Sequence, residues 1–421
     1  MNGETRLTTL ENGFRVISER LPGVRTAAVG VWVDAGTRHE PAELNGVAHL
    51  LEHMAFKGTR TRTARQIAEA IEAVGGSLNA WTSREQTAFH ARVLAEDVPL
   101  AVELVADILT EPLFDEEELA KEREVVLQEI GQVEDTPDDL VFDLLQEEAF
   151  PDQPLGRSIL GTEETIRAMS RPALATFMAE HYVPEAMILA AAGAVDHDRL
   201  VELARRWFGD RPARAAPPPP PARYRGGLAR DGRELEQVHL CLGVEGVPYR
   251  DPDYWPAQVL ATALGGGMSS RLFQEVRENR GLCYAIEVFS SSFLDTGLFG
   301  IYTGTGPQQV DELLEVTERE TRALVREPGP AEIERAKAQL RAGLLMSLES
   351  CAGVADAIAR QLAVYGRRIP VEEMLAAIEA VDLAAVRRVG ARLFGSGGAT
   401  TLVALGPVDR LPALEFGRIA G

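Results

Sequence analysis

The sequence predicts an α+β protein of two structurally similar domains, each a mainly antiparallel sheet with helices packed on one face. A chain of 421 residues exceeds what one hydrophobic core usually serves. Five consecutive prolines at 217–221 form an extended spacer, because proline lacks a backbone donor. The expected strands and helices also follow the same order before and after this spacer. We therefore expect domains at 1–211 and 225–421, joined by a linker at 212–224.

The first half alternates short strands with amphipathic helices. Asn12-Gly13 supplies the turn of a hairpin within residues 5–20. Thr63 is the expected N-cap of a helix that Gly75-Gly76 ends. The other elements follow from apolar periodicity. They are a strand at 26–36, a helix opening near Asn45, two strands within 77–94, helices at 96–110 and 115–133, two or three helices up to His181, a strand at 187–195 and a helix to Phe208.

The second half repeats this order without the features that could bind a metal. The expected elements are a strand at 236–246, a helix at 252–264, strands within 281–304, two long helices between about 307 and 350, and a closing helix and strand. When helix 115–133 is laid over its counterpart, Glu122 falls near Ala336 and Glu129 near Gly343. One half therefore carries the chemistry and the other keeps the scaffold.

Composition narrows the class of protein. The net charge of −21, from 43 basic and 64 acidic residues, argues against nucleic acid and anionic membranes as partners, and it mildly favours basic peptides. We expect a cytoplasmic protein, because the N-terminus lacks the apolar core of a signal peptide and no later run is long enough to cross a membrane. Cys241, Cys283 and Cys351 lie far apart without C-x-x-C spacing, which favours reduced thiols.

Two histidines one helical turn apart give the main functional signal. His49 and His53 can bind one ion from the same side of a helix, and Glu52 shares that side. His-x-x-Glu-His is the inverted zinc-peptidase signature, in which imidazoles hold zinc and the carboxylate acts on metal-bound water. The same helix has a separate apolar stripe, formed by Val47, Leu50, Leu51 and Met54.

A third protein ligand would leave the fourth position of the metal open for water. Glu122 and Glu129, seven residues apart, project within roughly 20° of each other along the edge of the apolar stripe of helix 115–133. A carboxylate there is costly unless it is paired or metal-bound. We favour Glu129 as the ligand and Glu122 as its supporting partner, although spacing alone does not rank the two. Glu52 would accept a proton from the water and later deliver it to the leaving amine.

With these residues, the chain resembles the pitrilysin and mitochondrial processing peptidase family of zinc endopeptidases, especially its short bacterial members. The likeness covers nearly the whole chain and includes the Glu122/Glu129 pair. Its longer motifs are AHLLEHMAFKGT at 48–59, GGSLNAWTSREQT at 75–87, PLGRSILGTEETI at 154–166 and SRLFQEVRENRGLCYAI at 270–286. The family uses such motifs to cleave peptides or unfolded segments in a closed chamber.

The resemblance also implies roles for individual residues. It implies a zinc site in this chain that holds one Zn²⁺, with His49, His53 and Glu129 as ligands, Glu52 as base and Glu122 as supporting carboxylate. Arg277 and Tyr284 match the arginine and tyrosine that hold substrate and stabilise the oxyanion. A peptide substrate would add as a strand beside Asn79 and Ala80.

Because family members with four such domains close two halves around a chamber, this two-domain chain is expected to form a homodimer. The zinc site of one subunit would then be completed in trans by Arg277 and Tyr284 of the other. Two alternatives stay open. The chain could be a non-catalytic assembly or binding subunit, or a protease that is active only with an unlike partner chain.

Overall fold

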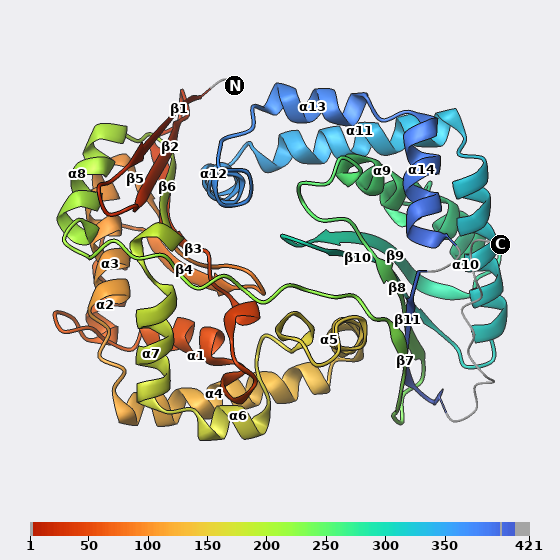
Figure 1. The fold of residues 1–421 in the computed structure, drawn as a ribbon, viewed down its shortest axis with the longest axis horizontal. Coiled ribbons are helices and arrows are strands. Elements are labelled where there is room, and N and C mark those ends of the chain that lie inside the picture. Colours follow the sequence, from red (N-terminus) through yellow and green to blue (C-terminus); the bar gives the residue numbers. More distant parts are fainter. Residues whose placement is uncertain (1–2, 396–397, 409–421) are drawn as a thin grey trace. The chain divides into compact units, whose positions relative to one another are not determined.

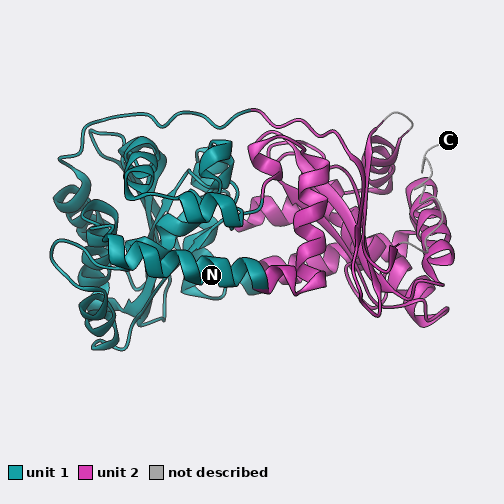
Figure 2. Ribbon diagram, turned by 90° about the horizontal axis from the view of Figure 1, so that it is seen from below, with its two compact units in different colours: residues 1–131, 158–220, 346–369 teal, residues 132–157, 221–345, 370–421 magenta. Residues whose placement is uncertain are grey.

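Two β-sheets organise the protein, as a computed structural model that describes residues 3–395 and 398–408 shows (Figure 1). The chain divides into two compact units. Unit 1 comprises residues 1–131, 158–220 and 346–369, and unit 2 comprises residues 132–157, 221–345 and 370–421 (Figure 2). The predicted α+β class with two sheets is confirmed.

The sheet of unit 1 has six strands in the order β1-β2-β6-β3-β5-β4. Its strands are β1 (Glu4–Thr9), β2 (Arg15–Arg20), β3 (Thr26–Val33), β4 (Ser77–Thr82), β5 (Thr87–Leu94) and β6 (Met187–Gly193). All neighbours pair antiparallel except β2 and β6, which are parallel. This order places β4 at one edge of the sheet.

Helices of the N-terminal half cover one face of this sheet. They are α1 (Val47–Ala55), α2 (Ala64–Glu72), α3 (Val98–Thr110), α4 (Glu116–Glu134, of which the last three residues belong to unit 2), α6 (Glu163–Ala168), α7 (Arg171–His181) and α8 (His197–Phe208). The core between these layers includes Val29, Val31, Leu50, Leu104 and Leu189, all fully buried. The predicted capping of α2 is present, because the Thr63 hydroxyl accepts a hydrogen bond from the Gln66 amide.

The sheet of unit 2 repeats the arrangement with one strand fewer, in the order β7-β11-β8-β10-β9. Its strands are β7 (Gly227–Gly232), β8 (Val238–Glu245), β9 (Cys283–Ser292), β10 (Gly297–Thr305) and β11 (Thr400–Gly406). The helices of this half are α9 (Tyr254–Gly265), a π-helical turn (Phe273–Glu278), α10 (Val310–Arg326), α11 (Pro330–Ser347), α13 (Val371–Glu379) and α14 (Leu383–Phe394). The parallel pair β7–β11 corresponds to β2–β6, which reflects the predicted repeat.

Each sheet also packs against a helix from the other half of the sequence. Helix α12 (Cys351–Tyr365) covers the second face of the first sheet, where Ile358 and Leu362 join Trp32 and Ile188 in a core cluster. Helix α5 (Pro137–Ala149) covers β8 and β11 in the same way. The prediction of helices on one face is therefore incomplete. The expected division at 1–211 and 225–421 also did not assign residues 132–157 to unit 2 or residues 346–369 to unit 1.

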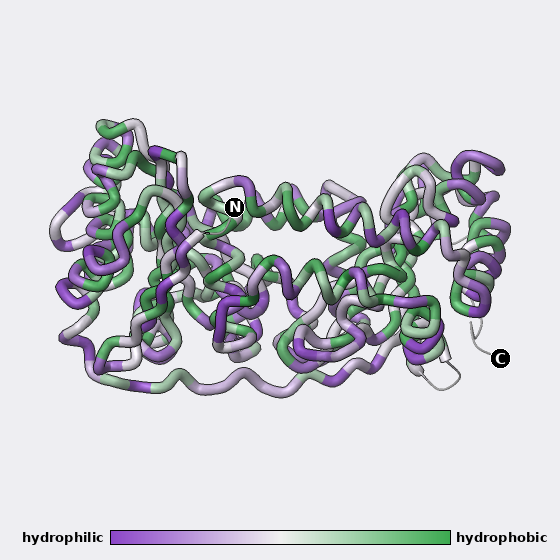
Figure 3. The backbone as a smooth tube through the Cα atoms, turned by 90° about the horizontal axis from the view of Figure 1, so that it is seen from above, coloured by the Kyte–Doolittle hydropathy of each residue, from purple (hydrophilic) through white to green (hydrophobic). Residues whose placement is uncertain are grey.

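The proline-rich segment has no helix or strand between residues 212 and 226. Figure 3 shows it as an extended stretch, pale to purple over most of its length. Among the described residues, no single helix is long and apolar enough to cross a membrane, although the bent pair α11 and α12 passes that test by length and composition alone.

Candidate metal centre

A buried carboxylate fixes the start of α1, the helix that carries the histidine pair. Glu40 is 2% exposed, and its side chain accepts hydrogen bonds from the Gly46 amide at 2.9 Å and the Ala48 amide at 2.8 Å. The side-chain amide of Asn45 donates to the same carboxylate at 2.9 Å. A negative charge at a helix N-terminus satisfies free amides and stabilises the helix dipole. The beginning of the motif helix is thus set by tertiary contacts.

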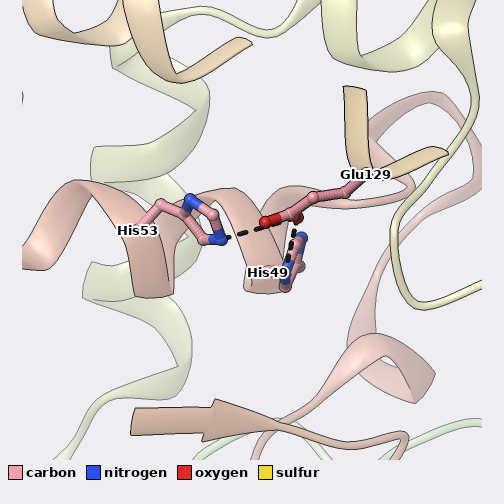
Figure 4. A group of neighbouring side chains, drawn as sticks. All are labelled: His49, His53 and Glu129. Atoms are coloured by element: carbon pink, nitrogen blue, oxygen red, sulfur yellow. Dashed lines mark ion pairs between the residues drawn. The ribbon is translucent and has the colours of Figure 1, made fainter. Parts of the chain in front are cut away.

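The candidate metal-ligating side chains converge within unit 1. The Nε2 atoms of His49 and His53 both lie 3.7 Å from Oε2 of Glu129, which reaches them from α4 (Figure 4). The three candidate ligand atoms are all within 4.8 Å of one another. Ligand atoms about 2.1 Å from a tetrahedral zinc are about 3.4 Å apart, so these positions fit one ion with little movement. Two imidazoles and one carboxylate are also a donor set of catalytic zinc sites.

Glu122 supports the opposite side of His53. His53 Nδ1 lies 3.1 Å from Oε2 of Glu122, and the neutral tautomer that donates this hydrogen bond presents an unprotonated Nε2 toward Glu129. Lys57 Nζ binds the other oxygen of Glu122 at 2.6 Å. The Glu122 side chain is only 6% exposed, so the ammonium group offsets the cost of burying its charge. Of the two glutamates that spacing could not rank, Glu129 faces both imidazoles and Glu122 contacts the outer nitrogen of one.

His49 is held in its neutral form by its surroundings. Burial, and secondarily electrostatic repulsion between the His49 and His53 rings when both are protonated, lower the pKa of His49 to about 4. A neutral imidazole is the state that binds a divalent metal. His49 Nδ1 is buried and has no hydrogen-bond partner among the described residues, unlike Nδ1 of His53. The two histidines therefore differ in how firmly their rings are oriented.

Glu52 lies beside the same centre and contacts strand β4. The hydroxyl of Thr82 donates to Oε2 of Glu52 at 2.6 Å. Burial raises the pKa of the Glu52 carboxyl, while this hydrogen bond and His53 oppose the change. A carboxyl whose pKa is raised in this way holds a proton more readily than an exposed glutamate, which suits it to accept and return a proton.

Strand β4 presents a free edge next to Glu52. The two-residue turn after β4 pairs Ser83 with Gln86, so the alternation of an antiparallel ladder turns the backbone groups of Leu78, Ala80 and Thr82 away from β5. The Asn79 side chain accepts a hydrogen bond from the Ala80 amide at 2.9 Å. Both predicted substrate-binding residues, Asn79 and Ala80, thus lie on this edge strand.

Comparison with known proteins identifies the family. Residues 15–163 match Insulinase (Peptidase family M16), and residues 168–340 match the Peptidase M16 inactive domain. An uncharacterized zinc protease of Streptomyces coelicolor is 42% identical over 93% of this chain and 88% of its own length. The chain belongs to peptidase family M16. Residues 168–340, which match the inactive domain, contain no H-x-x-E-H motif.

Other M16 relatives match over nearly their full length. The uncharacterized zinc protease YmxG of Bacillus subtilis is 39% identical over 96% of this chain and 99% of the relative. Among solved structures, a protease from Helicobacter pylori has a TM-score of 0.89 at 22% identity, covering 97% of this chain and 100% of that one. A peptidase M16 inactive domain from Pseudomonas fluorescens has a TM-score of 0.89 at 19% identity, covering 98% of this chain and 100% of that one. These two structures establish the shared fold.

Arg277 and Tyr284 lie together in unit 2. The guanidinium carbon of Arg277 is 4.9 Å from the ring centre of Tyr284 and 4.6 Å from that of Phe273. Tyr284 is 77% exposed at the start of β9, the edge strand of its sheet. A large aromatic ring with that exposure is available to another molecule. The structure therefore places this predicted pair on a surface of its own unit.

Sequence reasoning missed three residues of the M16 centre. Lys57 lies four residues after His53, just past the end of α1, and a lysine this close to an expected buried acid could have indicated it. Thr82 lies within the strand that was already predicted to bind substrate. Glu40 gives no local signal, because its role depends on the return of the chain to the start of α1.

Proposed function

We propose that this M16 chain is a zinc-dependent metalloendopeptidase that cleaves peptides or unfolded segments. The observation that carries the proposal is the convergence of His49, His53 and Glu129, with Glu52 hydrogen-bonded to the adjacent edge strand. The relatives named as zinc proteases support it. The chain keeps every residue that hydrolysis at such a centre requires, which argues against a purely structural subunit.

Each residue of the centre has a task in this proposal. His49, His53 and Glu129 would hold one Zn²⁺ per chain, and Glu122 with Lys57 keeps the His53 ring in the ligating orientation. The bound ion would polarise the scissile carbonyl and acidify a water molecule. Glu52 would act as the base, taking a proton from the attacking water and returning it to the departing amine.

The substrate is proposed to bind as an added strand on β4. The outward backbone groups of Ala80 and Thr82 would pair with the peptide, and the side chain of Asn79 would release the Ala80 amide for this purpose. Backbone pairing tolerates many side chains, which suits an enzyme of broad specificity. The hydrogen bond between Thr82 and Glu52 brings this edge next to the base.

A second subunit is proposed to complete the site. Arg277 can bind carbonyl or carboxylate oxygens, and the exposed hydroxyl of Tyr284 can donate to developing negative charge. In a homodimer these groups would act in trans and enclose the peptide in a chamber. A mixture of inactive Glu52→Gln and Tyr284→Phe chains tests this, because each mixed dimer should regain one intact site. No recovered activity would exclude completion in trans.

The function is tested by metal analysis together with cleavage of a mixed peptide pool with and without a chelator. We expect about one zinc per chain and internal cleavage that the chelator abolishes. The Glu52→Gln variant should keep its zinc and lose cleavage, because its side chain cannot take a proton. Bound zinc without cleavage by the native chain would instead favour a protease that needs an unlike partner, or a binding subunit.

A further inference from the structure

A row of aromatic and small side chains crosses the sheet of unit 1 on the face away from α1 and ends at the open edge. Trp32 on β3 pairs with Ala88 on β5, and Ala88 pairs with Trp81 on β4. Directly paired residues point to the same side of a sheet, so these three side chains share one face. Trp32 and Ala88 are buried there under α12, while Trp81 is partly buried at the end of the row.

Helix α12 places two charged groups over this row. Asp356 Oδ1 accepts a hydrogen bond from the indole nitrogen of Trp32 at 3.2 Å. Arg360, one turn further along, contacts Asp356 at 3.1 Å through Nε. Its guanidinium carbon lies 5.7 Å from the ring centre of Trp81, within the range of a cation–π contact. Trp32 thus anchors Asp356, and Asp356 positions Arg360 over Trp81.

Arg360 keeps the capacity to bind a further anionic group. Its side chain is 54% exposed, and a guanidinium group carries five N–H donors, of which the contact with Asp356 involves Nε. Stacking on an indole face leaves the rim of the guanidinium plane able to bind a carboxylate. An i,i+4 ion pair that only stabilised α12 would not require Arg360 to lie over Trp81 at the open edge.

The geometry of an added strand brings one substrate side chain to this position. Because Ala80 and Thr82 turn their backbone groups outward, an antiparallel peptide on β4 would face Trp81 with a residue in a non-hydrogen-bonded pair. Side chains of such pairs are closest together, and this residue would lie on the Trp81 face. Its neighbours in the peptide would point to the opposite face, where Glu52 and the histidines lie.

We propose that Trp81 and Arg360 form a substrate subsite, on the sheet face opposite the metal centre, that takes an acidic peptide side chain. The subsite rests on the proposed function, because it assumes that the peptide adds to β4. The Trp81 ring supplies apolar contact and Arg360 supplies the charge-assisted hydrogen bonds. The net charge of −21 mildly favours basic peptides overall, whereas this subsite selects an acid at one position.

Peptide binding by zinc-loaded Glu52→Gln protein tests the subsite without turnover. The probes are ten-residue peptides with one central Glu, Gln or Lys and otherwise uncharged side chains, which can slide to place the central residue opposite Trp81. Relative to the Gln peptide, we expect the Glu peptide to bind about threefold more tightly, as for a partly exposed ion pair. Adding Arg360→Glu should reverse the preference in favour of Lys, and adding Arg360→Gln should remove it.

Arg199→Glu is the matched control, because it changes the net charge equally at an exposed arginine of α8 that pairs with Glu202. This variant should keep the preference for Glu. If the role of Arg360 were purely structural, its two substitutions would weaken the binding of all three peptides equally. That result would overturn the subsite, and so would the absence of any peptide binding. The native chain reports separately on the proposed function. Cleavage without an Arg360-dependent preference refutes the subsite alone, and the expected reversal without cleavage refutes the endopeptidase alone.

Discussion

Lys57→Met should weaken zinc binding although Lys57 does not face the metal ligands. The substitution keeps the length of the side chain and removes the charge that pairs with Glu122. Glu122 would remain almost buried, with His53 Nδ1 as its other partner at 3.1 Å. Its carboxylate would then orient the imidazole less firmly, and the ring is a proposed ligand.

The magnitude follows from the burial of the two partners. Removing one partner of a fully buried ion pair costs about 3–5 kcal/mol. Lys57 is 31% exposed, so water can screen part of the loss, and about 1–2 kcal/mol is expected here. If most of that free energy is lost from the zinc-bound state, zinc affinity falls about tenfold. This is the low end of the loss in affinity, roughly 10- to 100-fold, seen when a residue that orients a metal ligand is replaced.

The assay is competition for zinc between the protein and a fluorescent chelator, with the native chain in parallel. Lys121→Met is the control, because Lys121 precedes Glu122 on α4 but is 64% exposed and pairs with Glu118. It should bind zinc with native affinity. Lys57→Arg should recover most of the loss, because it restores the charge. A native zinc affinity for Lys57→Met would refute the reasoning, and so would an equal loss in the Lys121→Met control.

Three further predictions concern stability. Gly46→Ala should lower the free energy of unfolding by about 1–3 kcal/mol in urea titrations, because φ is +92° and an added Cβ would lie 2.7 Å from the Leu160 carbonyl oxygen; native stability would contradict this. Ile358→Ala, in the buried face of α12, should cost about 2–5 kcal/mol, and a cost under about 1 kcal/mol would show that α12 packs loosely. Burial and the nearby His181 lower the pKa of His39 to about 4. As the pH falls below about 6.5, the His39 side chain therefore takes up its proton in the unfolded chain before it does so in the folded one. Between pH 6.5 and 4, the free energy of unfolding of the unsubstituted protein should fall by up to about 1 kcal/mol per pH unit more than that of His39→Gln. Parallel stability curves for the two proteins would exclude this contribution.

The sequence predicted the local elements of the site well because their signals are local. The H-x-x-E-H spacing, the N-cap at Thr63 and the hairpin turn at Asn12-Gly13 each depend on residues within one or two turns of chain. The helices α1 and α2 and the β1–β2 hairpin are present as expected. The choice between Glu122 and Glu129 was different. Both lie on one edge of α4, and only the packing of α4 against α1 distinguishes the residue that faces both imidazoles.

By itself, the sequence determined that the chain has two related α+β halves and that its first half carries the histidine pair, because residue spacing on a helix or strand is fixed by backbone geometry. The tertiary structure decided which distant groups meet them. It brought Glu122 to the outer nitrogen of His53 and to Lys57, Thr82 to Glu52, and α12 to the face of the sheet that Trp32 and Trp81 share. Such contacts join segments far apart in the chain, and their formation depends on the burial of complementary surfaces, which spacing along the sequence does not encode.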